Sequence, residues 1–500
     1  MSGIVGIITF GGQPLDKQLL RTITESMRFR GPDACEILSS ANFGFGHTLL
    51  RTSSESTGEK QPLNLNQKVW LTADARIDGR AELIAKLSEL NAREERSHED
   101  PSDAELILRA YLAWGEECVA HLIGDFSFAI LDLEKQRLFC ARDHFGIKPF
   151  YYARSGKSFI FSNPIETIQL HPEVTARLND QAIGDLLLFD FNRDPNRTSF
   201  QDISRLPPAH TLTLDLTTGE CRIKRYWSSP EAVTLRYRNQ SEYLEHFQDL
   251  FTRAVEDRIR TNRLQSFLSG GLDSTGIARE VVRIRQRLNR DLSLTGQCVV
   301  YRELMDDQEG HFASIAAEAL GIPLYYVVAD PYLLYEDAGA PELLKPEPVH
   351  EPLQKLTYHQ FSKIQADCRV ALSGLGPDAT MSFWLHSHIA SMKSNSRLAE
   401  LTMDLIRYFW LKRRPPRLHV LDRLGRTPGP QTLSDTYPRW LNKKFEERLE
   451  LNNREVLLQS KEMGSHFRRK QAFQLLSDPG NWTYHFEYAD SGTTRLPVEV

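Results

Sequence analysis

The chain has 500 residues, of which 41% are hydrophobic and 25% charged, and its formal net charge is −5 at pH 7. This balance is typical of a soluble globular protein, and the length predicts two or three domains that can each bury a core. Because the net charge is weakly negative, the chain has no general attraction to nucleic acid or to an anionic membrane. We therefore expect neither as a partner.

The N-terminal residues and the cysteines indicate a cytoplasmic protein without a structural metal. The first ten residues, MSGIVGIITF, carry no basic residue before their short apolar run. The chain also has no uninterrupted stretch of about 18 apolar residues, the length that a membrane-spanning helix needs. Its six cysteines form no CxxC pair, which favours reduced, buried thiols over disulfide bonds or zinc ligands.

Apolar runs separated by turn residues predict a strand-rich α/β domain in the first two hundred residues. The predicted strands cover residues 3–10, 69–77, 125–132, 137–142 and 159–162, and the predicted helices cover 15–27 and 103–114. The pattern weakens over residues 216–241, where turn residues gather. We interpret this stretch as a linker between a domain at 1–215 and a second domain at 242–500.

The second domain begins with apolar residues at helical spacing, which predict an amphipathic helix over 243–259. Short apolar runs then alternate with helical patterns. The predicted strands are 264–268, 293–300, 324–328 and 369–372, and the predicted helices are 277–287 and 311–320. Such alternation predicts a doubly wound parallel sheet, with ligands bound at the carboxyl ends of its strands.

A glycine-rich turn, SGGLDST at residues 269–275, follows the first predicted strand of this domain and leads into a helix. Its two glycines let the backbone approach an anion, and the helix-terminal amides and hydroxyls can donate hydrogen bonds to phosphate oxygens. The turn lacks the lysine of the GxxxxGK[ST] loop, which disfavours kinase or GTPase chemistry. Asp273 would repel phosphate unless a divalent cation lay between them, so we expect Mg²⁺ there.

The segment SGGLDS resembles the pyrophosphate-binding loop of enzymes that adenylate a substrate, including asparagine synthetases. SGLGPD at 373–378 resembles the second ATP-facing loop of that family. Three further segments resemble signatures of the family's glutaminase-type domain: RGPD at 30–33, GDFSF at 124–128 and ARDHFGIKP at 141–149. This resemblance implies an α/β chain with an N-terminal Ntn-type glutaminase-like αββα domain and a C-terminal ATP-pyrophosphatase (PP-loop) domain.

The resemblance also implies ATP and Mg²⁺ as cofactors and assigns residues to them. Asp273 and Asp378 would hold Mg²⁺. The nucleotide would be bound by Leu268, Ser269, Gly270, Gly271, Asp273, Ser274, Val300, Ser373 and Gly374. The implied reaction activates a carboxylate as its AMP ester, releases pyrophosphate and passes the acyl group to an amine.

The N-terminal domain departs from the family at the residues that hydrolyse glutamine. Glutamine-dependent members begin Met-Cys-Gly and use the cysteine as an N-terminal nucleophile, whereas Ser2 stands here. The family's His-x-Arg-Leu is HTLL at 47–50, its Asn-Gly-Glu is DAR at 74–76, and only Asp103 of the glutamine pocket is retained. Each charged contact is worth about 1.5–3 kcal/mol, so we expect an inactive glutaminase. A shifted alignment in which Arg51 supplies the missing arginine stays open.

The acceptor loop and the end of the chain also depart from the family. Leu375 stands where asparagine synthetases carry a glutamate that helps to prepare ammonia, and leucine cannot move a proton. Residues 496–500 resemble the start of a family stretch, EVRxPFLD, that continues into helices bearing a catalytic lysine. We therefore expect a C-terminally truncated chain, and whether this chain can catalyse the reaction by itself is in question.

These observations predict an ATP-dependent, amide-forming ligase that does not hydrolyse glutamine. Its substrates would be small molecules or a peptide, because Ser2 and the acceptor loop resemble those of β-lactam synthetases and lasso peptide cyclases. Two alternatives remain open: an asparagine synthase that makes asparagine from aspartate, and a non-catalytic nucleotide-binding scaffold. A homodimer is compatible with each of them.

Overall fold

Two stacked antiparallel sheets form the N-terminal domain in the computed structural model, which describes residues 1–65, 67–90, 100–228, 235–374, 398–413, 437–454, 496, 498 and 499. The first sheet has the order β10-β8-β9-β1-β3-β2, with β1 Gly3–Thr9, β2 Ala34–Ser39, β3 Phe43–Leu49, β8 Tyr151–Ser155, β9 Ser158–Ser162 and β10 Ser204–Arg205. The second has the order β12-β11-β7-β6-β5-β4, with β4 Leu63–Asn64, β5 Val69–Asp78, β6 Ile123–Asp132, β7 Arg137–Arg142, β11 His210–Asp215 and β12 Cys221–Arg225. The five strands predicted in this domain are confirmed.

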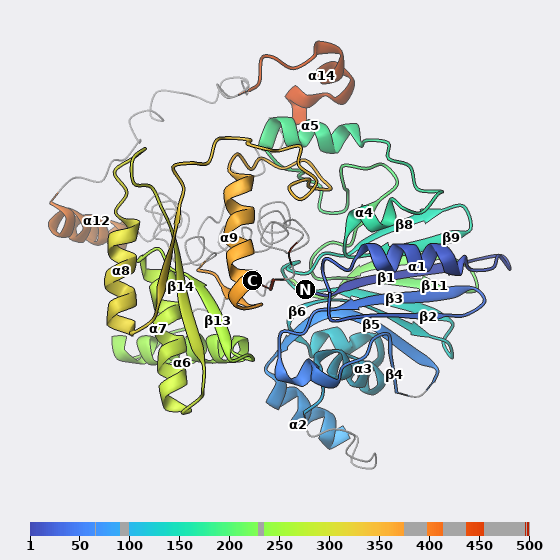
Figure 1. Cartoon of the computed structure of the whole chain (residues 1–500), viewed down its shortest axis with the longest axis horizontal. Coiled ribbons are helices and arrows are strands. Elements are labelled where there is room, and N and C mark those ends of the chain that lie inside the picture. Colours follow the sequence, from blue (N-terminus) through green and yellow to red (C-terminus); the bar gives the residue numbers. More distant parts are fainter. Residues whose placement is uncertain are drawn as a thin grey trace.

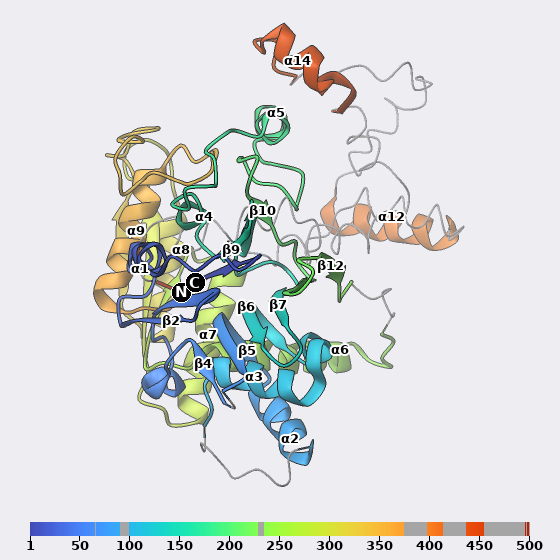
Figure 2. The same ribbon diagram turned by 90° about the vertical axis from the view of Figure 1, so that its right-hand side faces the viewer.

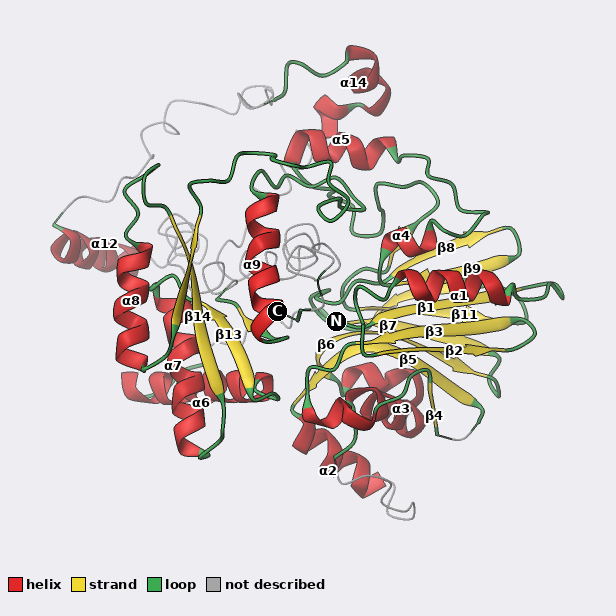
Figure 3. Cartoon of the chain, in the orientation of Figure 1, coloured by secondary structure: helices red, strands yellow, loops and turns green. Residues whose placement is uncertain are grey.

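Helices cover the outer faces of both sheets, as Figure 3 shows. The first sheet packs against α1 (Lys17–Ser26) and α4 (Ile165–Ile168), and the second against α2 (Arg80–Leu90) and α3 (Asp103–Trp114). Strand β1 shows how the pleat divides its residues: Ile4 and Ile8 lie between the sheets, whereas Val5 and Ile7 pack toward the helices. The predicted αββα layering is therefore confirmed. The remaining elements of this domain are α5 (Asp180–Phe189) and the 3₁₀ helices η1 (Ser54–Gly58) and η2 (Gly115–Ala120).

One part of the predicted domain boundary is wrong. Strand β12 lies inside the stretch 216–241 that the sequence predicts as a linker, but it pairs with β11 along its whole length. The sequence of β12 is rich in polar and basic residues and so does not look like that of a buried strand. The reason is that β12 is the exposed edge strand of the sheet.

The second domain contains a parallel sheet of order β15-β14-β13-β16, with β13 Arg263–Phe267, β14 Ser293–Val300, β15 Leu324–Val328 and β16 Ala371–Leu372. On one face pack α6 (Gln240–Arg258), α7 (Leu272–Arg287) and α8 (Glu309–Leu320), and on the other packs α9 (Gln354–Asp367). From β13 the chain adds β14 and β15 on one side and then returns to place β16 on the other side of β13. The order in which strands are added therefore reverses between β13 and β16. Two further helices are described, α12 (Leu398–Lys412) and α14 (Lys443–Leu449).

The doubly wound parallel sheet predicted for this domain is confirmed, and its switch point lies between β13 and β16. All six cysteines are free, as their spacing predicts. Within the described ranges, none of the helices is both long and apolar enough to cross a bilayer.

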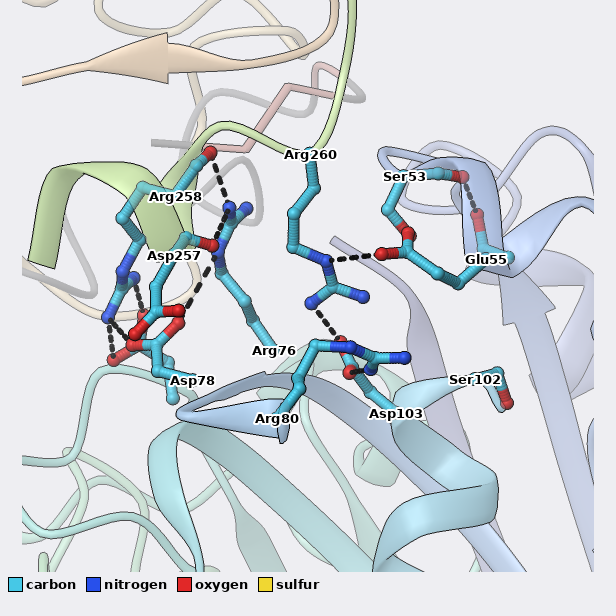
Figure 4. A network of polar contacts seen from close by, with 12 residues as sticks. Ser53, Glu55, Arg76, Asp78, Arg80, Ser102, Asp103, Asp257, Arg258 and Arg260 are labelled. Atoms are coloured by element: carbon cyan, nitrogen blue, oxygen red, sulfur yellow. Dashed lines mark hydrogen bonds and ion pairs between the residues drawn. The ribbon is translucent and has the colours of Figure 1, made fainter. Parts of the chain in front are cut away.

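The C-terminal end of α6 docks onto the second sheet of the N-terminal domain. The Nη2 atom of Arg258 lies 2.7 Å from Oδ2 of Asp78, and its Nη1 atom pairs with the carboxylate of Asp125. The backbone N–H of Gly79 donates to Asp257 at 3.1 Å. Buried carboxylates of one domain thus meet cations of the other (Figure 4).

The segment around Glu499 lies beside the N-terminus (Figure 1 and Figure 2) and adds a second contact between the domains. Its backbone exchanges hydrogen bonds of 2.8 Å with Arg369 and Ala371 in the second domain. Its side chain lies 3.4 Å from Nζ of Lys148 and 3.7 Å from Nη1 of Arg76 in the first. Burial alone would raise the pKa of Glu499, but Lys148 and Arg76 hold that pKa well below its ordinary value.

We expect the substitution Arg258→Ala to destabilise the chain by about 3–5 kcal/mol, because it leaves Asp78 and Asp125 largely buried without their cation. Urea unfolding followed by tryptophan fluorescence measures this change. The matched control is Arg253→Ala, an exposed residue on the same helix, which should shift stability by no more than about 0.5 kcal/mol. Equal unfolding midpoints for the two variants would contradict the importance of this contact.

Candidate functional site

The glycine-rich turn lies at the carboxyl end of β13, at the switch point of the parallel sheet. Gly270 has a φ of +77°, and a Cβ there would lie 2.5 Å from backbone and Cβ atoms of Phe312, so only glycine fits. The hydroxyls of Ser269 and Ser274 are 3.1 Å apart, and the N–H of Gly271 faces the Ser269 hydroxyl at 3.4 Å. Helix α7 starts at the next residue, so its free amides point toward this turn.

The donors of this turn fit a phosphate group. The Oγ1 atom of Thr275 is buried and has no hydrogen-bond partner within the described ranges, a situation that buried hydroxyls rarely keep without a ligand or water. The side chain of Leu272 at the tip of the turn is 93% exposed and leaves the backbone accessible. Asp273 is half-buried and is the carboxylate of the turn. The described residues contain no cluster of three metal-ligating side chains, so Asp273 would need phosphate oxygens or further residues to complete a Mg²⁺ site.

The second predicted loop starts directly against the first. A Cβ on Gly374 would lie 3.0 Å from the backbone N of Ser274, so the end of β16 and the start of α7 are in van der Waals contact. Ser373 precedes it, immediately after β16. The structure thus brings together the predicted residues of two segments a hundred positions apart. Their role in nucleotide binding stays a prediction.

Leu268 follows the last residue of β13 and Val300 ends β14, and both side chains lie in the hydrophobic core, where they are 1% and 5% exposed. This placement leaves their main chain as the part that could contact a nucleotide. Leu375 and Asp378, predicted for the acceptor loop and for Mg²⁺, lie outside the described residues.

Ser2, at the position of the family's nucleophile, is buried directly before β1, an interior strand of the first sheet. Its hydroxyl accepts a hydrogen bond from the N–H of Leu50 at 3.1 Å, and its own N–H donates to Oδ1 of Asp74 at 3.1 Å. Asn163 donates to the carbonyl oxygen of Ser2 at 2.8 Å. The residue is therefore held firmly in place.

The space beside Ser2 is a cavity of about 30 Å³, which is room for one or two water molecules. It is lined by Leu49, Ala75, Arg76 and Asp103 among others. Burial raises the pKa of Glu59, a further lining residue, to about 7. This cavity is small, and Ser2 is one of the residues that line it.

An arginine of the second domain lines the cavity and pairs with two of its neighbours. Arg260, two residues beyond α6, places Nη1 2.7 Å from Oδ2 of Asp103 and Nε 3.2 Å from Oε1 of Glu55 (Figure 4). The other carboxylate oxygen of Asp103 pairs with Arg80. Asp103, the one residue retained from the family's glutamine pocket, is thus neutralised by two arginines.

Arg76, which stands where the family has a glutamate, binds the end of α6. Its Nη2 atom donates to the carbonyl oxygens of Asp257 and Arg258 at 3.2 and 2.5 Å, the groups that a helix leaves free at its C-terminus. Arg51 lines a separate outer cleft and is not among the residues that line the cavity beside Ser2. The shifted alignment that would use Arg51 as the missing arginine stays a prediction.

The signature segment at 141–149 builds the loop that carries Lys148. Asp143 accepts hydrogen bonds from the backbone N–H groups of Phe145, Ile147 and Lys148 at 2.9–3.0 Å. The Nζ atom of Lys148 then reaches Asp74 at 3.8 Å, next to Ser2. The sequence reveals this segment as a motif, but not the contacts of Arg260 or Glu499, because no local pattern pairs residues so far apart.

Comparison with known proteins agrees with this two-part arrangement. A glutamine amidotransferase domain model matches residues 1–227, and an asparagine synthase model matches residues 246–480. Two such segments in one chain define a protein that joins an amidotransferase domain to an asparagine synthase domain. The chain belongs to the asparagine synthetase family.

Similar proteins include the glutamine-hydrolyzing asparagine synthetase 3 of Bacillus subtilis, 32% identical over 55% of this chain and 44% of the relative. Asparagine synthetase 2 of the same organism is 27% identical over 76% of this chain and 51% of the relative. The amidase chry2 of Gibberella zeae is 26% identical over 66% of this chain and 51% of the relative. The chain thus spans about half the length of the curated relatives it matches.

We expect Gly270→Ala to destabilise the chain by at least 1–2 kcal/mol, the approximate cost of the left-handed conformation alone for a residue with a Cβ. The matched control is Gly276→Ala in α7, where an added Cβ meets nothing within 4 Å and should stabilise the helix by up to about 1 kcal/mol. Thermal unfolding of both variants measures the difference. A Gly270→Ala variant as stable as the wild type would show that the turn has another backbone conformation.

Proposed function

We propose that this chain is an ATP-dependent carbon–nitrogen ligase that adenylates a carboxylate, releases pyrophosphate and transfers the acyl group to an amine without hydrolysing glutamine. The observation that carries the proposal is the meeting of two glycine-containing loops at the switch point of a parallel sheet, with Gly374 packed against Ser274. Membership of the asparagine synthetase family supports the same chemistry.

The residues of the first loop have distinct tasks in this proposal. The free amides of α7 and the hydroxyls of Ser269, Ser274 and Thr275 would donate hydrogen bonds to the phosphates. Asp273 would share Mg²⁺ with the phosphate oxygens and so offset the repulsion between two anions. Bound ATP would supply the adenylyl group that activates the carboxylate, with pyrophosphate as the leaving group.

The N-terminal domain supports the absence of glutamine hydrolysis. Its cavity beside Ser2 has room for one or two water molecules, and Arg260 and Arg80 already pair with Asp103. Opening the pocket would therefore break ion pairs that also join the two domains. Ser2 would act there as a structural residue.

The amine acceptor is the least constrained part of the proposal. Leu375 would provide no base for ammonia, whereas an amine held by its own substrate body gains from proximity, worth about 7–11 kcal/mol in favourable cases. We therefore propose a small-molecule or peptide amine, and the amidase among the relatives supports amide chemistry beyond asparagine. Composition further favours a cytoplasmic protein without nucleic acid or membrane partners.

We expect the protein to bind ATP in the presence of Mg²⁺, and Asp273→Ala to weaken that binding at least tenfold, since a charged contact is worth about 1.5–3 kcal/mol. Titration calorimetry with and without Mg²⁺ measures the effect. Asp291→Ala, an exposed carboxylate before β14, is the control and should bind ATP like the wild type. Turnover should yield AMP and pyrophosphate, and the detection of ADP and phosphate would rule out adenylation.

The nitrogen donor can be tested directly. We expect no glutamate from glutamine and ATP, and no rescue by Ser2→Cys, because a thiol does not enlarge the cavity or displace Arg260. Glutamate release that Ser2→Ala abolishes would overturn this expectation.

With aspartate, ATP and ammonium, asparagine measured by mass spectrometry should stay at background. Efficient asparagine formation would instead favour an asparagine synthase.

A further inference from the structure

A cleft of about 510 Å³ opens between the domains, on the side of the parallel sheet away from the candidate nucleotide site. Five arginines line it: Arg51, Arg260, Arg263, Arg290 and Arg369. We call it the arginine cleft. Its volume lies in the range of about 300–1,000 Å³ that is typical of small-molecule sites.

The arginine cleft is distinct from the glycine-rich turn. Arg263 is the first residue of β13, Arg290 precedes β14 and Arg369 precedes β16, so these three side chains start at the amino ends of the strands. The glycine-rich turn follows the carboxyl end of β13. A ligand in the arginine cleft would therefore not touch that turn.

Carboxylates neutralise only part of this charge. Arg369 pairs with Asp33, and Arg260 pairs with Glu55 and Asp103. Arg51, Arg263 and Arg290 form no ion pair within the described ranges. The described residues of the cleft therefore carry net positive charge in a confined space, which favours a multivalent anion.

Hydrogen bonds fix several of the arginines. Nε of Arg51 donates to the carbonyl oxygen of Ser56 at 3.3 Å, and Nη1 of Arg290 donates to that of Ile259 at 2.9 Å. Arg369 donates to the carbonyl oxygen of Arg51 at 3.3 Å and so joins the two domains at the rim. Each of these contacts uses one nitrogen of a guanidinium that has several donors, which leaves others for a ligand.

The remaining lining residues are also rich in donors. The N-terminal domain contributes Thr52, Ser53 and Ser54, and the second domain contributes Thr261 and Asn262. Hydroxyls and guanidinium forks together match the oxygens of a phosphate. The cleft offers no carboxylate among its lining residues that would repel one.

We propose that the arginine cleft is a second anion site, which binds a multivalent phosphate of pyrophosphate size between the two domains. The anion would attract Arg51 from one domain and Arg263 and Arg290 from the other, and so would stabilise their arrangement. Through Arg260, which lines both the cleft and the cavity beside Ser2, the bound anion would also act on the ion pair with Asp103.

The test is calorimetric titration with inorganic pyrophosphate in the absence of Mg²⁺. We expect the double variant Arg263→Gln/Arg290→Gln to bind pyrophosphate at least tenfold more weakly than the wild type. Arg253→Gln, an exposed arginine on α6, should bind normally. The variant Ser269→Ala/Ser274→Ala should keep this binding, because its changes lie in the glycine-rich turn.

Two outcomes would overturn the proposal: an unchanged isotherm for the arginine double variant, or loss of binding in the serine double variant. Arg263→Gln alone, which removes an exposed side chain, gives the same test if the double variant does not fold. Titrations with ATP distinguish a free pyrophosphate from a nucleotide as the ligand. Citrate that binds as tightly as pyrophosphate would contradict the phosphate assignment.

Discussion

The arrangement of the two domains depends on a short segment, residues 257–260, at the end of α6. Its two arginines reach carboxylates of the N-terminal domain: Arg258 meets Asp78 and Asp125, and Arg260 meets Glu55 and Asp103. Arg76 in return binds the carbonyl oxygens at the end of that helix. Because these groups lose water when the domains join, each needs its partner in place, and the contact fixes one relative orientation.

The same constraint explains the altered glutamine pocket. The resemblance assigns Asp103 to the family's glutamine pocket, and here arginines of both domains pair with that residue. Arg260 satisfies Asp103, and Arg76 faces the helix end of the other domain. Polar groups that would be costly to bury alone are thus paired across the interface. The surroundings of Asp103 are thus part of the domain contact, and Ser2 is buried.

At the candidate nucleotide site, the topology of the parallel sheet decides the arrangement. Parallel strands bring their carboxyl ends to one edge of the sheet. Because the strand order reverses between β13 and β16, the loops that follow these two strands diverge and leave a site between them. Only glycine fits at position 270, because atoms of Phe312 lie where a side chain would begin, and a Cβ on Gly374 would be in tight contact with Ser274. The amino ends of the same strands carry arginines, so the two edges of one sheet present different chemistry to solvent.

The sequence by itself determined the strands of the first domain, the parallel sheet of the second and the place of the turn SGGLDS after a strand, because periodicity and turn residues are local signals. It also showed which family residues are missing. The tertiary structure alone decided that β12 belongs to the sheet, since an exposed edge strand lacks the alternation of a buried one. It likewise decided that Arg51 lines the arginine cleft and that Arg260 pairs with Asp103. Long charged side chains pair with whichever opposite charge lies within reach. Residues such as Asp103 and Arg260 become neighbours only after the domains have folded and docked.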